Sequence, residues 1–137
     1  QVTEESVRES SIATVEVSTS DTFETKTTIV ATSATIYFDY DKYNLTSRSI
    51  QTLRGVISAM NDNESLTLVV EGHADERGTR EYNLALGQRR AESVADYLES
   101  RGVNRSRLVI KSYGEEMPAI SASNENAWSK NRRVEIK

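Results

Sequence analysis

Two segments constrain the fold of this chain most. Each has apolar residues at helical spacing and follows a short run rich in β-branched residues. The first run covers residues 34–38 (ATIYF) and the second covers residues 66–70 (LTLVV), and both have the composition of strands. After each run, apolar residues recur at steps of three and four, which marks one face of a helix. The pattern therefore predicts strand, helix, strand, helix.

The first helix is expected after a polar turn at residues 39–44. Thr46 or Ser47 can cap it, because a side-chain hydroxyl accepts a hydrogen bond from a free N–H of the first turn. Residues 61–63 (NDN) are expected to end the helix. Its apolar face consists of Ile50, Leu53, Val56, Ile57 and Met60.

The second helix is expected to start after Thr79, with Glu81 in the first turn favourable to the helix dipole. Its predicted buried stripe is Leu84, Gly87, Ala91, Val94 or Ala95, and Leu98. Gly87 lies inside this stripe although glycine costs about 1 kcal/mol in a helix interior, which predicts a close approach of the helix to a sheet. Gly102 is expected to end the helix in a left-handed conformation.

Two more strands are expected, at residues 108–110 and 134–136, and the segment between them is expected to be a loop containing Pro118 and Trp128. Neighbouring strands joined by a helix are usually parallel, with right-handed crossovers. Since only two main helices are expected, one face of the sheet would be covered. The predicted fold class is a two-layer α/β sandwich.

Residues 1–33 differ from the rest: 14 are Ser or Thr, six are acidic and two are basic, whereas residues 34–137 carry 15 acids and 15 bases. A linker or a loosely attached edge strand is expected, rather than an independent module. The segment is a flexible linker, because so little apolar surface cannot offset the entropy of ordering. Alternatively it is a loosely attached edge strand, since residues 14–18 alternate apolar and polar.

Composition excludes several functional classes. The charge balance of residues 34–137 lacks the basic face that nucleic acid or an anionic membrane surface requires. No stretch approaches the roughly 20 apolar residues that span a bilayer, and no signal peptide is seen. Without cysteine, and with His73 as the only histidine, disulfides, thiolate sites and a histidine-rich metal site are excluded. Neither a cofactor nor a metal is expected.

Polar side chains follow the first two strands where each is expected to end. Asp39 and Asp41 follow the first, and His73 and Asp75 follow the second. Parallel strands would bring both loops to one edge of the sheet, where ligands tend to bind in open α/β folds.

The second helix starts from the same edge, and Asn83 and Arg90, two turns apart, share one of its faces. Carboxylates on the loops and a guanidinium on the helix suit a zwitterion. Simpler interpretations stay open. Asp75 could satisfy backbone N–H groups, Arg90 could belong to a solvated helix face, and the loop aspartates could be ordinary turn residues. His73 is more often a structural residue than a catalyst, and the tyrosines are expected in the core or at its rim.

Five motifs in order resemble the signature of the OmpA-like peptidoglycan-binding family. They are residues 37–43 (YFDYDKY), 72–79 (GHADERGT), 82–91 (YNLALGQRRA), 112–116 (SYGEE) and 130–134 (KNRRV). The resemblance covers residues 34–137. Within the family, the chain is most similar to the subgroup of peptidoglycan-associated lipoproteins (Pal). It implies an α+β fold of order β-α-β-α-β-β, with the helices on one face of a mixed sheet.

The resemblance further implies that the ligand is the peptidoglycan stem peptide, held through meso-diaminopimelate. Asp75 would take its free ammonium and Arg90 a free carboxylate. A lysine-type stem lacks that carboxylate, so discrimination is expected, because a buried charge without a partner is costly. The implied site positions are Tyr40, Asp41, His73, Ala74, Asp75, Arg77, Gly78, Asn83, Leu86 and Arg90.

The implied role is non-enzymatic: tethering the outer membrane or an envelope complex to the cell wall, in the periplasm of a Gram-negative bacterium. The alternative is an envelope protein interaction domain with TolB as a partner. A hydrolase that uses Asp39, Asp41, Asp75 and His73 is a third hypothesis, but no nucleophile elbow, HExxH pair or phosphate loop supports it. The family's lipoproteins carry a lipidated cysteine, so membrane attachment would need an anchor outside this sequence.

Overall fold

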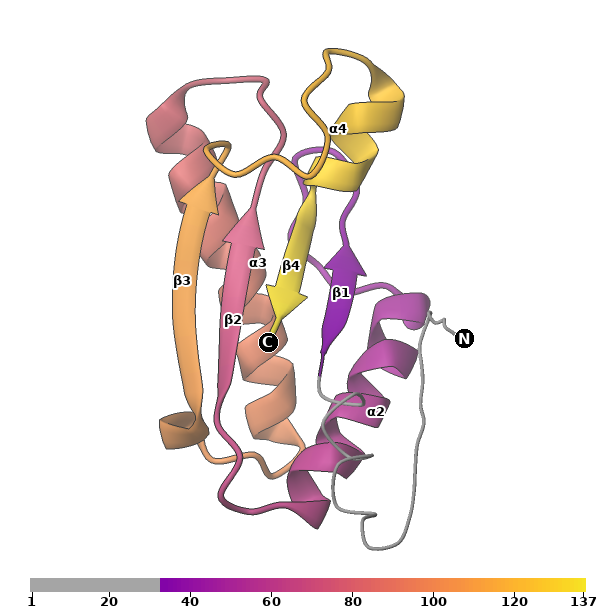
Figure 1. Cartoon of the computed structure of the whole chain (residues 1–137), viewed down its shortest axis with the longest axis vertical. Coiled ribbons are helices and arrows are strands. Elements are labelled where there is room, and N and C mark those ends of the chain that lie inside the picture. Colours follow the sequence, from indigo (N-terminus) through magenta and orange to yellow (C-terminus); the bar gives the residue numbers. More distant parts are fainter. Residues whose placement is uncertain (1–32) are drawn as a thin grey trace, which may run out of the picture.

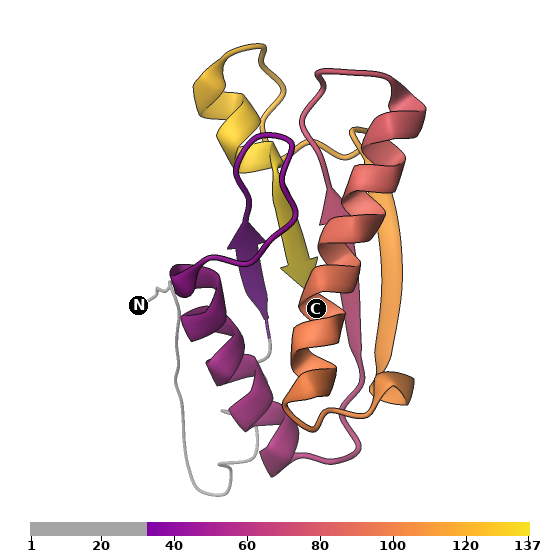
Figure 2. The same ribbon diagram turned by 180° about the vertical axis from the view of Figure 1, so that it is seen from behind.

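A computed structural model describes residues 33–137, and these residues form two layers (Figures 1 and 2). The sheet contains β1 (Ala34–Tyr37), β2 (Leu68–His73), β3 (Leu108–Gly114) and β4 (Arg133–Ile136). Helices α2 (Ser47–Asp62) and α3 (Arg80–Ser100) cover one of its faces. The two-layer α/β fold is confirmed. The linker and edge-strand interpretations concern residues that lie, apart from Ser33, outside the described part of the chain.

The sheet is mixed, with the strand order β1-β4-β2-β3. β2 pairs with β3 in parallel, and β4 pairs antiparallel with both β1 and β2. The C-terminal strand therefore separates β1 from β2, and these two strands run in the same direction. As a result the loops after β1 and after β2 leave the sheet at one edge, at the top of Figure 1.

Both predicted N-caps are confirmed. The Thr46 hydroxyl accepts a hydrogen bond from the Ser49 backbone N–H at 3.2 Å, and Thr79 accepts one from the Tyr82 N–H at 3.0 Å. Asn63 is the C-cap of α2, and Gly102, with φ 101°, follows the end of α3. These local signals define where each helix begins and ends.

The stripe predicted for α3 is confirmed except at its first position. Leu84 is 50% exposed, so its prediction as a buried residue is wrong, and Asn83 is buried in its place. The Asn83 amide donates to the Arg77 backbone carbonyl and to Glu115, which makes burial of this polar group favourable. Leu84 instead packs its backbone close to Gly114 at the outer strand β3.

The close approach predicted from Gly87 is confirmed. A Cβ atom on Gly72 of β2 would lie 1.8 Å from the Gly87 carbonyl oxygen of α3. Because neither residue has a side chain, α3 lies against the sheet at this point. The core below it consists mainly of aliphatic side chains from both layers, including Ile36, Leu53, Val56, Met60, Leu68, Val70, Val94, Leu98, Val134 and Ile136.

Two expectations need correction. The segment expected as a loop between the last two strands contains the short helix α4 (Glu125–Asn131), which carries Trp128, and a 3₁₀ turn (Arg105–Arg107) precedes β3. The second strand starts at Leu68 and includes His73, which was expected beyond its end. Among residues 33–137 no helix is both long and apolar enough to cross a membrane.

Candidate functional site

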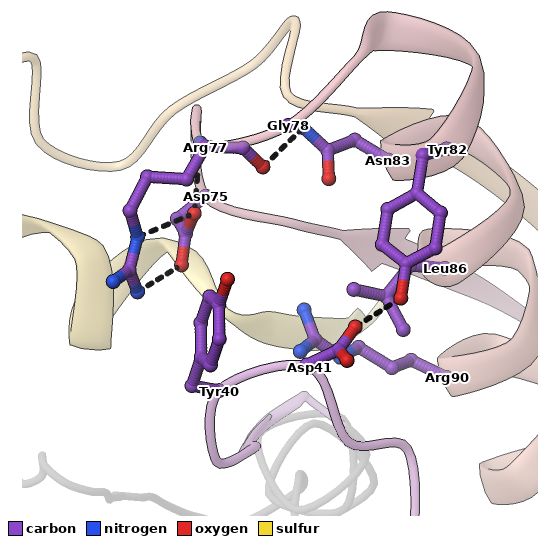
Figure 3. Close-up of a pocket in the computed structure, with 9 residues that line it drawn as sticks. All are labelled: Tyr40, Asp41, Asp75, Arg77, Gly78, Tyr82, Asn83, Leu86 and Arg90. Carbon is purple, nitrogen blue, oxygen red and sulfur yellow. Dashed lines mark hydrogen bonds and ion pairs between the residues drawn. The ribbon is translucent and has the colours of Figure 1, made fainter.

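A pocket of about 260 Å³ lies at the sheet edge where β1 and β2 end (Figure 3). The loop after β1, the loop after β2 and the first turns of α3 form its walls. Its lining residues are Tyr40, Asp41, Asp75, Arg77, Gly78, Tyr82, Asn83, Leu86 and Arg90. The fold therefore brings together eight of the ten positions expected from the sequence.

The other two expected positions, His73 and Ala74, do not line this pocket. Ala74 is buried, and its backbone N–H donates to the Gly114 carbonyl oxygen at 2.9 Å. Side chains alternate along a strand, and Gly72 faces α3, so the His73 side chain lies on the opposite face of the sheet, which α2 and α3 do not cover. The histidine needed by the hydrolase hypothesis is therefore directed away from the pocket.

Tyr82 was missed as a site residue. Its hydroxyl donates to the carboxylate of Asp41, which lies across the pocket on the loop after β1. Asp41 has a left-handed backbone with φ 57°, an uncommon conformation for a non-glycine residue. The spacing of Tyr82 and Leu86, one helical turn apart, is the sequence signal that could have placed Tyr82 on the pocket face.

Asp75 is buried and fully paired. Its Oδ1 accepts the Arg77 backbone N–H at 2.9 Å and the Arg77 Nε at 3.3 Å, and its Oδ2 accepts Nη2 at 2.9 Å. Burial raises the pKa of Asp75, but the hydrogen bonds and charge of Arg77 outweigh it and hold the pKa below its ordinary value. The carboxylate is therefore ionised at neutral pH.

The Arg77 guanidinium lies between two aromatic rings. Its Cζ is 4.2 Å from the centre of the Tyr40 ring and 4.0 Å from that of Trp128. Trp128 belongs to α4, and its indole N–H donates to Glu76 at 2.9 Å. Stacking of this kind is favourable for a guanidinium, so Arg77 links the loop after β1, the loop after β2 and α4.

Arg90 is fully buried, so its interpretation as part of a solvated helix face is wrong. Its Nε donates to the Lys42 carbonyl at 2.8 Å, Nη1 to the His73 carbonyl at 2.9 Å and Nη2 to the Asp39 carbonyl at 3.2 Å. Burial lowers the pKa of Arg90 to about 10, which leaves it cationic at neutral pH. Arg90 thus joins the end of β2 to the loop after β1. The other two N–H groups of its guanidinium donate to none of these three carbonyls.

Arg132 is a further buried cation beside the site that sequence reasoning missed. Its Nε donates to the Phe38 carbonyl at 2.9 Å, and its Nη1 lies 3.6 Å from Asp75 Oδ2. Its position within the motif at residues 130–134 was the available signal. The pocket region consequently combines carboxylates and guanidinium groups, the two charge types that a zwitterionic ligand requires.

Comparisons with known proteins identify relatives of this chain. The OmpA family matches residues 37–132. The peptidoglycan-associated lipoprotein of Pasteurella multocida is 48% identical over 100 residues, which cover 73% of this chain and 67% of that protein. That of Haemophilus influenzae is also 48% identical over 100 residues, covering 73% and 65%. The chain thus spans about two thirds of the length of these relatives.

Among solved structures, the peptidoglycan-associated lipoprotein from Burkholderia pseudomallei is similar, with a TM-score of 0.73 and 35% identity. The match covers 74% of this chain and 86% of that one. The two proteins therefore share a fold over about three quarters of this chain.

Proposed function

The chain belongs to the OmpA family, and we propose that it binds peptidoglycan non-covalently and ties the outer membrane or an envelope complex to the cell wall from the periplasm. Relatives with nearly half of the matched residues identical are named peptidoglycan-associated lipoproteins, which supports association with the cell wall. The observation that carries the proposal is a pocket with opposite charges, built from residues of the family motifs.

The ligand group that fits this pocket is meso-diaminopimelate of the stem peptide. Its side chain ends in a carbon that bears both an ammonium and a carboxylate. Asp75 is the acceptor proposed for the ammonium, and the N–H groups of Arg90 not given to backbone carbonyls are proposed for the carboxylate. A lysine-type stem offers only the ammonium, so it would leave the arginine without its partner.

The rim of the pocket suits the rest of the stem peptide. Tyr40 and Tyr82 are exposed on opposite walls, and Leu86 contributes an apolar side chain to the wall formed by α3. Such a site offers few contacts to each stem peptide, so individual binding would be modest. Many stem peptides on one polymer would supply avidity for an envelope complex that carries several copies.

Binding without catalysis is part of the proposal. The relatives carry names that describe association and not a reaction. Neither titratable carboxyl group of the pocket has a histidine partner, since the only histidine lies on the other face of the sheet. Muropeptides incubated with the protein should therefore be recovered intact, as chromatography would show.

Isothermal titration calorimetry tests the ligand assignment. A muropeptide with diaminopimelate and its lysine counterpart are titrated into the unaltered protein, Asp75→Asn and the control Asp62→Asn, at the exposed end of α2. Binding of only the first ligand, retained in Asp62→Asn and at least about tenfold weaker in Asp75→Asn, is expected. Equal affinity for both ligands would rule out the role of the second carboxylate. No heat and no NMR shift would rule out stem-peptide binding.

A protein partner such as TolB on the same surface is a second candidate. The exposed tyrosines at the pocket rim favour it, because aromatic side chains are enriched in protein interfaces. One protein can have both functions if each copy binds either the stem peptide or TolB at any given moment. Competition between TolB and the diaminopimelate muropeptide for this protein would support the shared surface, and independent binding would exclude it.

A further inference from the structure

Three potential metal ligands lie on the face of the sheet that the helices leave uncovered. Glu71 and His73 belong to β2, and Glu135 belongs to β4. Glu71 and Glu135 are direct cross-strand partners, and His73 follows two residues after Glu71 on the same face. Two like charges placed opposite each other on a sheet destabilise it unless a cation lies between them.

A lysine ammonium lies at this position. Lys137 Nζ is 3.2 Å from Glu71 Oε1 and 3.5 Å from Glu135 Oε1. The other oxygen of Glu135, Oε2, accepts a hydrogen bond of 2.6 Å from Arg133 Nε. The two Oε1 atoms therefore share one cation, and Arg133 orients the second carboxylate from outside the cluster.

His73 provides independent evidence that this cluster suits a ligand. It is only 2% exposed, yet neither of its ring nitrogens has a hydrogen-bond partner among the described residues. Buried polar atoms are nearly always paired, so an orphaned pair of nitrogens calls for an explanation. The ring is held in place by Tyr113, whose ring centre lies 5.5 Å away in a stacked arrangement.

A neutral imidazole ring keeps a lone pair on one nitrogen, and this is the group through which histidine binds a metal ion.

We propose that Glu71, His73 and Glu135 form a binding site for a divalent cation of the zinc type. One ligand atom from each residue can be chosen so that all three lie within 4.8 Å of one another. Zinc bonds of about 2.0–2.1 Å require ligand atoms to approach somewhat closer, which rotation of the two glutamate side chains can supply. One imidazole and two carboxylates leave a fourth tetrahedral position for water.

The ion would take the place of the Lys137 ammonium. The Lys137 side chain is 59% exposed, so it can move into solvent. Its backbone stays fixed, since its N–H and C=O both pair with Val69 at 3.0 Å. The hydrogen bond from Arg133 to Glu135 Oε2 survives the exchange and would orient the ligand, as outer-sphere partners do in other metal sites.

This inference does not depend on the proposed function. The cluster lies on the uncovered face of the sheet and shares no side chain with the pocket. A failed muropeptide titration and a failed zinc titration would therefore be separate results.

Zinc chloride titrated into tag-free, metal-free protein tests the site, with calorimetry for affinity and NMR for the imidazole signals of the single histidine. One equivalent of zinc should bind and shift the His73 signals. Removal of a ligand in His73→Gln should weaken binding at least about tenfold. Removal of the competing ammonium in Lys137→Met should tighten it several-fold. The control Lys130→Met, on α4, should match the unaltered protein.

Two results would overturn the proposal. His73 signals that stay in place at millimolar zinc would exclude coordination, whatever heat surface carboxylates produce. Equal zinc affinity of Lys137→Met and Lys130→Met would exclude a site between the two carboxylates. Both substituted lysines are exposed, so this comparison remains informative even if His73→Gln does not fold.

Discussion

Arg77 donates three hydrogen bonds to the carboxylate of Asp75, one from its backbone and two from its guanidinium. The two residues are separated by one position in the loop after β2, so the pair forms with the loop itself. In this arrangement the guanidinium occupies the place proposed for the ammonium of the ligand. Binding would therefore exchange one cation for another and displace Arg77 from between Tyr40 and Trp128.

Replacement of Arg77 by Gln should raise the pKa of Asp75, because burial then acts without the hydrogen bonds that oppose it. In the unaltered protein the depressed pKa of Asp75 stabilises the fold at pH values above 3.8, the ordinary pKa of this carboxyl group. This stabilisation is lost as the pH falls through the pKa of Asp75 in the folded state. Arg77→Gln should lose about 1 kcal/mol of stability at pH 7. Carboxyl NMR titration and urea unfolding measure both effects. An Asp75 pKa unchanged from that of the control Arg80→Gln would contradict the assignment.

Trp128 should report ligand binding through its fluorescence. It is the only tryptophan, and the Arg77 guanidinium stacks on its ring. Displacement of Arg77 by the diaminopimelate muropeptide should change the Trp128 emission, with the same midpoint as calorimetry. The change should be absent in Asp75→Asn. Binding heat without any change in emission would show that Arg77 stays in place.

Arg90→Lys should destabilise the fold by about 3 kcal/mol. Lysine cannot reach the three backbone carbonyls that Arg90 joins, and buried acceptors left unpaired cost about 1–3 kcal/mol each. Urea unfolding measures the loss. The matched control is the exposed neighbour, Arg89→Lys, with an expected change within about 0.5 kcal/mol. Equal stability of the two variants would refute the structural role of Arg90. Because this role affects folding, any loss of ligand binding by Arg90 variants must be compared with their stability.

Gly72→Ala should destabilise the fold by about 3 kcal/mol or more, because its Cβ would overlap the Gly87 carbonyl and force α3 away from the sheet. Gly55→Ala provides the opposite case. No atom outside the adjoining backbone of α2 lies within 4 Å of a Cβ at this position, in the interior of the helix, so alanine should stabilise the helix by about 0.5–1 kcal/mol. Thermal unfolding of both variants checks the contrast. A tolerated Gly72→Ala would mean that the two layers are not closely packed there.

Local features of the fold were predictable from the sequence. The helix caps at Thr46 and Thr79 depend on neighbouring residues. The close contact of α3 with the sheet at Gly87 depends on helical periodicity. The short helix α4 was missed because seven residues with little apolar surface give no periodic signal, although Asn124 is a normal N-cap. The exposure of Leu84 could not be read from periodicity, because α3 buries the hydrogen-bonded amide of Asn83 in its place.

The candidate site was predictable as a set of positions but not as a network. Strand ends and helix faces placed Asp41, Asp75 and Arg90 together. The partners of Arg90 are backbone carbonyls, which leave no trace in the sequence of side chains. The contact between Arg77 and Trp128 joins segments 51 positions apart, so it depends on the complete tertiary structure.

The position of β4 between β1 and β2 also constrains the order of events during synthesis. The two pocket loops follow strands that do not touch each other, and only β4, at residues 133–136, hydrogen-bonds to both. A growing chain that has made β1, α2, β2 and α3 holds every pocket side chain, but it lacks the strand that sets the loops side by side. Such pairings between distant segments form late. A ribosome-bound nascent chain therefore cannot complete this pocket until β4 has emerged.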